Sequence, residues 1–273
     1  MTGSRRPASG PEILLLLRLA MAWFWLLAWL RVAPHGGCGV LLAVMTPAVG
    51  AVALNMLEPA VLRRHAFVRQ YLRPDKALAW WLSRRLLLIL WQIIKAVGLV
   101  VVLLVAALQW PGWMLALLAG DVLVAFGLYS ALLAVMDRQA RPWVAPMLAR
   151  RVLVWVNALL LLGAVVAVEL VTPHPDYRLL DWNATLDEAM GPVTVGCRLL
   201  APLARTVAGQ EAIAWRLMQM GVEGLGDSLA ALLAWVLFLA ASTLAVWAWS
   251  RLLAGVLVDG GGVRIMAGRS DDD

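Results

Sequence analysis

Long apolar runs alternate with short polar segments along this chain, and this alternation predicts its architecture. An α-helix needs about 20 mainly apolar residues to cross the hydrocarbon core of a bilayer, and six stretches reach or approach that length. We therefore predict an all-α, polytopic bundle of about six membrane-spanning helices, forming one membrane domain over residues 1–273. The predicted spans are 13–30, 39–57, 86–108, 114–136, 152–171 and 228–249.

The composition agrees with a membrane protein and excludes an ordinary soluble domain. Hydrophobic residues make up 63% of the chain and charged residues 15%, whereas soluble domains contain roughly 45–50% apolar and about 25% charged residues. A soluble fold of this composition would expose large apolar patches to water. The first run follows Arg5 and Arg6, but no small-residue cleavage site follows it. We interpret it as a retained span rather than a cleaved signal peptide.

Positive charges are distributed unevenly among the connections, which predicts the orientation of the chain. Of 23 Lys and Arg residues, 16 lie in the N-terminal segment and in 58–85, 137–151 and 250–273, whereas 5 lie in the alternate connections. Lys and Arg accumulate on the cytoplasmic side of membrane proteins. We therefore expect a multi-pass protein of the bacterial inner membrane, with both termini in the cytoplasm and 172–227 in the periplasm. Because the basic residues follow this rule and are spread over several loops, no nucleic-acid partner is expected.

Two connections contain more than a turn. Segment 58–85 can place apolar residues on one helical face and arginines on the rest, which predicts an amphipathic helix on the cytoplasmic surface. Segment 172–227 contains two moderately apolar stretches, 193–208 and 212–222, separated at Gly209. These stretches predict two short helices packed at the outer face. The arginines expected to contact lipid or a cytoplasmic partner are Arg63, Arg64, Arg69 and Arg73.

Charged side chains inside the predicted spans mark candidate functional positions, because each costs about 2.5–3.5 kcal/mol at the centre of a membrane helix. Lys95 and Asp121 lie deepest, on consecutive spans joined by a short turn. Three interpretations are open for them: an ion pair that locks this helical hairpin, a polar transport pathway, or contact with a partner subunit. The full set of polar candidates in the spans is Arg18, Asn55, Gln92, Lys95, Asp121 and Asn157.

Most of these polar candidates fall in the half of their spans nearer the cytoplasm. A water-filled groove open to the cytoplasm explains this clustering, and hydrogen bonding between helices explains it equally well. Arg18 is close enough to a helix end for its long side chain to reach the interface.

Signatures of catalysis and metal binding are sparse. The chain has no HExxH, GxSxG or P-loop motif and no His or Cys cluster with metal-ligand spacing, so we predict no catalytic residue, metal or cofactor. The GLGD sequence that ends at Asp227 matches the GxGD pattern of intramembrane aspartyl peptidases, for which Asp121 would be the second carboxylate. A turn and helix N-cap explain Asp227 better, and so short a pattern arises by chance. A peptidase is therefore the remotest of the functional hypotheses.

The two cysteines, Cys38 and Cys197, both lie in segments predicted to face outward. An oxidising periplasm permits a disulfide between them, which would tie the first outer turn to the large outer segment. Two unpaired small apolar residues are the alternative.

The layout of the predicted elements resembles that of ABC-2 type exporter permeases. Those proteins have six spans, both ends inside, a cytoplasmic coupling helix between the second and third spans, and short outer helices between the fifth and sixth. Segments 58–85 and 172–227 fall where those features fall. The resemblance implies a homodimeric permease that docks a separate cytoplasmic ATPase on 58–85. The alternative is a membrane scaffold or accessory subunit that packs against other membrane subunits of a larger assembly.

Overall fold

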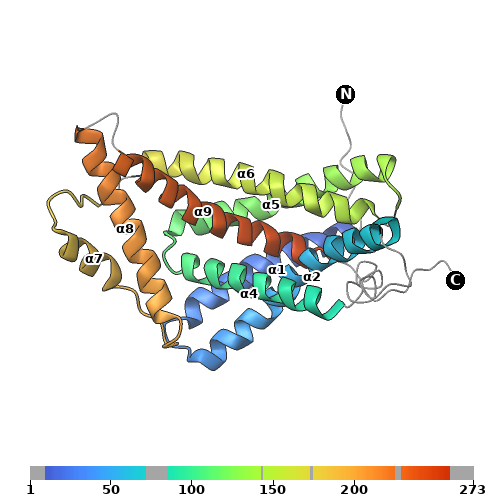
Figure 1. The fold of residues 1–273 in the computed structure, drawn as a ribbon, viewed down its shortest axis with the longest axis horizontal. Coiled ribbons are helices and arrows are strands. Elements are labelled where there is room, and N and C mark those ends of the chain that lie inside the picture. Colours follow the sequence, from blue (N-terminus) through green and yellow to red (C-terminus); the bar gives the residue numbers. More distant parts are fainter. Residues whose placement is uncertain (1–9, 72–84, 143, 173–174, 225–228, 259–273) are drawn as a thin grey trace.

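The computed structural model describes residues 10–71, 85–142, 144–172, 175–224 and 229–258, which form eight helices and no strand (Figure 1). The prediction of an all-α bundle with about six long helices is confirmed. Two less apolar helices, α7 (Trp182–Met190) and α8 (Ala201–Gly224), precede the last of the long apolar helices. The long helices are α1 (Gly10–Val32), α2 (Cys38–Tyr71), α4 (Arg85–Ala107), α5 (Gly112–Gln139), α6 (Ala145–Val171) and α9 (Leu229–Val256).

The long helices have the length and composition to cross a membrane. α1, α2, α4, α5 and α6 each contain a candidate span of at least 21 residues, within which an 18-residue window has a mean hydropathy of 2.0 or more. α9 has 28 residues, and its part with described side chains, Thr243–Val256, is also apolar. Large apolar side chains stay exposed on these helices, for example Met21 at 68% and Leu86 at 77%. Such extensive exposed apolar surface fits contact with lipid.

The six long helices alternate in direction, so the bundle has two distinct ends (Figure 1). α7 and α8 lie at the end where α1, α4 and α6 finish. The opposite end contains the last turns of α2 and α9 and the first turns of α4 and α6. The predicted orientation places α7 and α8 outside and the opposite end in the cytoplasm.

Several helices extend beyond the predicted spans, mostly at the end opposite α7 and α8. α2 continues through Pro59 to Tyr71, so that its last part prolongs the second span where a separate surface helix was predicted. α6 starts at Ala145 rather than at 152, and α9 ends at Val256 rather than at 249. In two of these extensions, Glu58 of α2 and Arg150 of α6 form an ion pair inside the bundle. Residues 72–84, the remainder of the predicted surface segment, lie outside the described residues.

α9 is the central helix of the packing, because it contacts α1, α2, α4, α6 and α8. α4 packs against α2 and α9, whereas α5 packs against α6 and α1. The consecutive helices α4 and α5 therefore do not form the side-by-side hairpin that their short connection suggested. Each of them packs instead against helices that are distant in sequence.

The close packing of α2 against α9 depends on a glycine, which has no side chain. A Cβ atom at Gly255 of α9 would collide with the backbone of Ala51 on α2. Small residues at helix interfaces let two backbones approach closely. This approach brings Asn55 of α2 within hydrogen-bonding distance of Arg251 of α9.

The outer helices α7 and α8 form a small layer across one end of the bundle. Asp181 precedes α7, and its carboxylate accepts a hydrogen bond from the Ala184 N–H at 2.6 Å, as an N-cap residue does. α8 runs without a break through Gly209, where a separation between two helices was predicted. A Cβ atom there would come within 3.1 Å of Leu186 on α7. Gly209 therefore permits close α7–α8 packing and does not end a helix.

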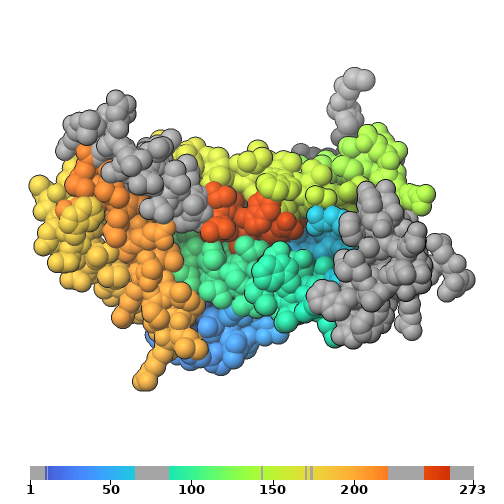
Figure 2. All heavy atoms as spheres, in the orientation of Figure 1, coloured from blue at the N-terminus to red at the C-terminus, as the bar shows by residue number. Residues whose placement is uncertain are grey.

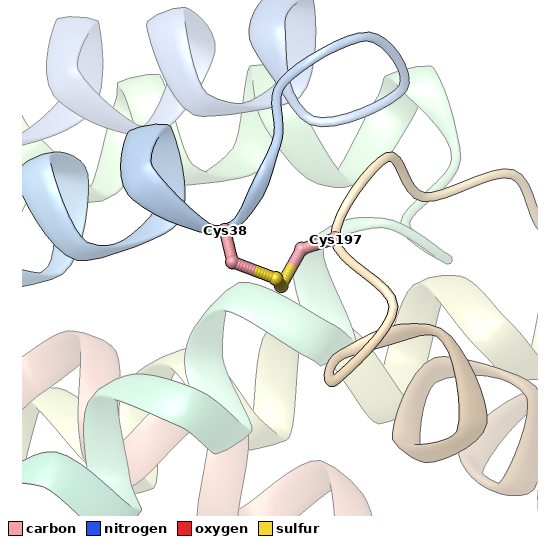
Figure 3. The surroundings of a disulfide bond; sticks show 2 residues. All are labelled: Cys38 and Cys197. Atoms are coloured by element: carbon pink, nitrogen blue, oxygen red, sulfur yellow. A yellow bond between two sulfur atoms is a disulfide. The ribbon is translucent and has the colours of Figure 1, made fainter.

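A disulfide between Cys38 and Cys197 joins this outer layer to the bundle (Figure 3). Cys38 is the first residue of α2, and Cys197 lies in the segment that precedes α8. Beside the disulfide, the Gly196 N–H donates a hydrogen bond to the Ala33 carbonyl at 3.0 Å. The covalent and hydrogen-bonded contacts together attach the segment before α8 to the turn between α1 and α2.

Candidate functional site

A polar cavity of about 260 Å³ lies between α2, α4, α6 and α9, near the end of the bundle opposite α7 and α8. Figure 2 shows α9 flanked by α6 and α4, with α2 beside it. The cavity lining contains four cations, one carboxylate and two amides. These side chains are Asn55, Glu58, Arg63, Gln92, Lys95, Arg151 and Arg251.

Arg251 is the most enclosed of the four cations. Its Nη1 donates a hydrogen bond to Asn55 Oδ1 at 3.0 Å, and its guanidinium lies 5.1 Å from the centroid of the Trp247 ring. Its Nε is buried and has no hydrogen-bond partner among the described residues. The positive charges of Arg63 and Arg151 act on the same guanidinium. The packing thus holds three arginines near one another although like charges repel.

The other three cations of the cavity are exposed. Arg63 Nε donates a hydrogen bond to the Pro59 carbonyl at 3.1 Å. Lys95 Nζ lies 5.0 Å from the centroid of the Trp91 ring, which is a cation–π distance. Neither contact neutralises a charge, so both cations can still attract an anion.

The carboxylate of the cavity, Glu58, is paired with Arg150. Arg150 Nη2 lies 2.6 Å from Glu58 Oε2, and the two side chains are 2% and 3% exposed. Arg150 Nη1 also donates a hydrogen bond to the Leu257 carbonyl at 3.3 Å. Because Arg150 neutralises Glu58, the cavity lining as a whole is positively charged.

A second polar cluster lies between α5, α6 and α9, and its residues do not line the cavity. Asp121 Oδ2 accepts hydrogen bonds from Trp249 Nε1 at 2.8 Å and from Asn157 Nδ2 at 3.1 Å. Asn157 Nδ2 also lies 3.3 Å from Ser250 Oγ, and all four residues are buried. Hydrogen bonding between buried groups of neighbouring helices is a way to join membrane helices. We interpret this cluster as structural.

Replacing Asp121 by leucine should destabilise the bundle by about 1–3 kcal/mol, because Trp249 and Asn157 would lose a buried acceptor. Asp121→Asn retains an acceptor oxygen of the same shape and should cost less. Equilibrium unfolding in mixed detergent micelles, followed by tryptophan fluorescence, measures both. If both substitutions lower the free energy of unfolding equally, the hydrogen-bond acceptor at residue 121 is not what stabilises this cluster.

The structure separates the polar residues predicted within the spans into different groups. Asn55, Gln92 and Lys95 line the cavity, whereas Asp121 and Asn157 belong to the second cluster. The interpretation of Lys95 and Asp121 as an ion pair is therefore wrong, since α4 and α5 do not pack side by side.

The remaining predicted residues lie apart from both groups or outside the description. Arg18 is half-buried on α1 and does not line the cavity. Arg64 is half-buried on α2. The side chain of Arg69 and all of Arg73 and Asp227 lie outside the described residues.

Several residues of these sites were assigned to connections or overlooked by the sequence analysis. Glu58, Arg150, Arg151 and Arg251 lie just beyond the ends of the predicted apolar runs, where charged residues are ordinarily exposed at the interface. The one sequence feature that could have indicated a buried charge is Glu58, an acidic residue that directly follows an apolar run. Trp249 gave no signal, because tryptophans at the ends of spans ordinarily lie at the interface.

A second cavity lies at the end of the bundle that α7 and α8 cover. This mainly apolar cavity of about 330 Å³ lies between the α4–α5 connection and helices α6, α8 and α9, and its lining includes Glu169 and Glu211. Close to this side, burial raises the pKa of the Tyr177 hydroxyl above its ordinary value, and the negative charges of Glu188 and Glu211 raise it further. The mainly apolar cavity and the basic cavity thus lie at different ends of the bundle.

No family model, curated protein or solved structure matches this chain. Its class follows from its own helices, which are long and apolar enough to cross a membrane several times. The chain is a multi-pass α-helical membrane protein.

Proposed function

We propose that this chain is a non-enzymatic transport subunit, the permease component of an export complex. The observation that carries the proposal is the cavity between α2, α4, α6 and α9, where four cations gather along membrane-spanning helices. Charged groups in such helices are costly and generally mark the pathway of a substrate or ion. The cavity offers a polar substrate a place to enter from the cytoplasm.

The two ends of the bundle differ chemically in the way that this role requires. The disulfide lies at the end covered by α7 and α8, and disulfides persist in oxidising compartments such as the bacterial periplasm. The basic cavity lies at the opposite end, and the Lys and Arg excess there favours the cytoplasm. We therefore propose a bacterial inner membrane location, with α7 and α8 in the periplasm.

A permease needs a source of energy, and this chain has no P-loop of its own. The ABC-2-like layout, in which α7 and α8 lie between the fifth and sixth long helices, implies a separate ATPase in the cytoplasm. The proposed docking segment consists of the last turns of α2 and the residues that follow them.

Charge reversal in the docking segment should release the ATPase. A pull-down of tagged protein in mild detergent, followed by mass spectrometry, should recover a stoichiometric cytoplasmic ATPase. Arg69→Glu with Arg73→Glu should lower its recovery about tenfold or more. The new glutamates would face the acidic ATPase surface that a basic docking segment attracts, and like charges facing each other at an interface cost several kcal/mol. The matched control is Arg138→Glu with Arg141→Glu, which reverses two exposed charges elsewhere on the proposed cytoplasmic side. Equal recovery with both variants would contradict docking at this segment.

A scaffold or accessory subunit is the second candidate function. The observation in its favour is the Asp121 cluster, in which a deep intramembrane charge is enclosed by hydrogen bonds within the protein. Recovery of membrane subunits without an ATPase in the same pull-down would support this candidate over the permease.

A further inference from the structure

We infer that the basic cavity binds a phosphate group, supplied either by a phospholipid head group or by a soluble phosphorylated molecule. As a substrate site this inference rests on the proposed function. As a binding site it rests on the cavity alone, and the experiment below measures binding without transport.

The cavity lining carries a large excess of positive charge. Arg63, Lys95, Arg151 and Arg251 converge on it from four helices. The single carboxylate of the lining is already neutralised by Arg150, which makes that bond at 2.6 Å. Like charges held together at the edge of a low-dielectric bundle repel one another, and a bound anion would relieve that repulsion. The cavity is therefore complementary to an anion with more than one charged oxygen.

The number and directions of the cations favour a phosphate over a carboxylate. The Glu58–Arg150 pair shows that one guanidinium suffices for one carboxylate in this bundle. The cavity instead presents three guanidiniums and an ammonium from different directions. A tetrahedral phosphate can accept hydrogen bonds from several directions, and arginine forks are well suited to it. Arg251, which lines the cavity, also has an Nε without a hydrogen-bond partner within the described residues.

The size and surroundings of the cavity also fit a phosphate compound. Pockets that enclose drug-sized molecules have volumes of about 300–1,000 Å³, so 260 Å³ suits a head group or a small phosphorylated molecule. On α4, the Trp91 ring lies 5.0 Å from Nζ of the cavity residue Lys95, and this tryptophan is 56% exposed. Acyl chains of a phospholipid can lie against this apolar surface while the phosphate occupies the cavity.

The test compares a cavity variant with a matched control in two binding measurements. Arg63→Gln with Arg151→Gln removes two exposed cavity charges. Arg138→Gln with Arg141→Gln removes two exposed charges that do not line the cavity. Formation of the Cys38–Cys197 disulfide, seen as a mobility difference on non-reducing gels, verifies that each variant folds.

The first measurement is calorimetry of glycerol 3-phosphate binding to delipidated protein in neutral detergent. The second is native mass spectrometry of lipid retained from mixtures of phosphatidylglycerol and phosphatidylcholine. We expect wild type and control to bind in at least one measurement, with affinity that falls as salt rises. The cavity variant should bind about tenfold more weakly or worse. Binding of glycerol 3-phosphate identifies a soluble source, and selective retention of phosphatidylglycerol identifies a lipid source.

Two results would overturn the inference. One is wild-type protein that binds neither probe. The other is a cavity variant that binds as well as the control in every measurement that detects binding. Neither result depends on an ATPase or on export. The phosphate site can therefore be disproved without disproving the proposed function, and the proposed function without disproving the phosphate site.

Discussion

Arg150→Met is expected to lower the free energy of unfolding by about 3–5 kcal/mol, the usual cost of leaving one member of a buried ion pair without its partner. Glu58 would then keep a carboxylate that is only 3% exposed in the native structure. The Leu257 carbonyl would also lose a donor. Unfolding in mixed micelles of a mild detergent and dodecyl sulfate measures the loss.

The neighbouring residue provides the control for this experiment. Arg151→Met changes the next residue of α6, which is exposed, and should have a much smaller effect on stability. The double variant Glu58→Leu/Arg150→Met should recover most of the loss, because apolar replacement of a whole buried pair is often neutral or stabilising. If Arg150→Met costs no more than Arg151→Met, the pair does not hold α2 against α6.

Loss of the disulfide should have the second largest effect. Cys38→Ala with Cys197→Ala is expected to cost about 2–5 kcal/mol, the usual range for a native disulfide. The bond closes a sequence separation of 159 residues, so it restricts most of the chain in the unfolded state. It also attaches the segment before α8 to the start of α2.

Reduction provides an independent measurement of the same contribution. Dithiothreitol should destabilise the wild-type protein by about as much as the double alanine substitution does, and should leave the variant unchanged. A wild-type protein whose stability does not respond to reduction would show that the bond contributes nothing measurable.

The apolar runs predicted the existence of every long helix but not where each one ends. A run of about 20 apolar residues must be a helix in a bilayer, since its backbone groups have no water to bond to. The ends of the runs are ambiguous, because charged residues there are ordinarily exposed at the interface. From their positions at the ends of runs, Glu58 and Arg150 were expected to be exposed. In the structure they pair inside the bundle, within longer α2 and α6 helices.

The candidate site could be predicted only in part. The sequence identified Asn55, Gln92 and Lys95 as polar residues in the cytoplasmic halves of their spans, and a groove there was one of two explanations. The structure places all three on one cavity. Arg151 and Arg251 were counted as loop charges, because nothing local distinguishes a cation that lines a cavity from one that faces solvent.

By itself, the sequence determined that this chain is an all-α membrane protein with about six spans, because hydrophobicity and run length act locally and leave few alternatives in a bilayer. Tertiary structure alone decided the partners of the polar residues. The chain connection suggested that Asp121 faces Lys95, but the packing of α5 on α6 and the central position of α9 give it Asn157 and Trp249. Such pairings depend on which helices become neighbours, and in this bundle the neighbours are helices distant along the chain.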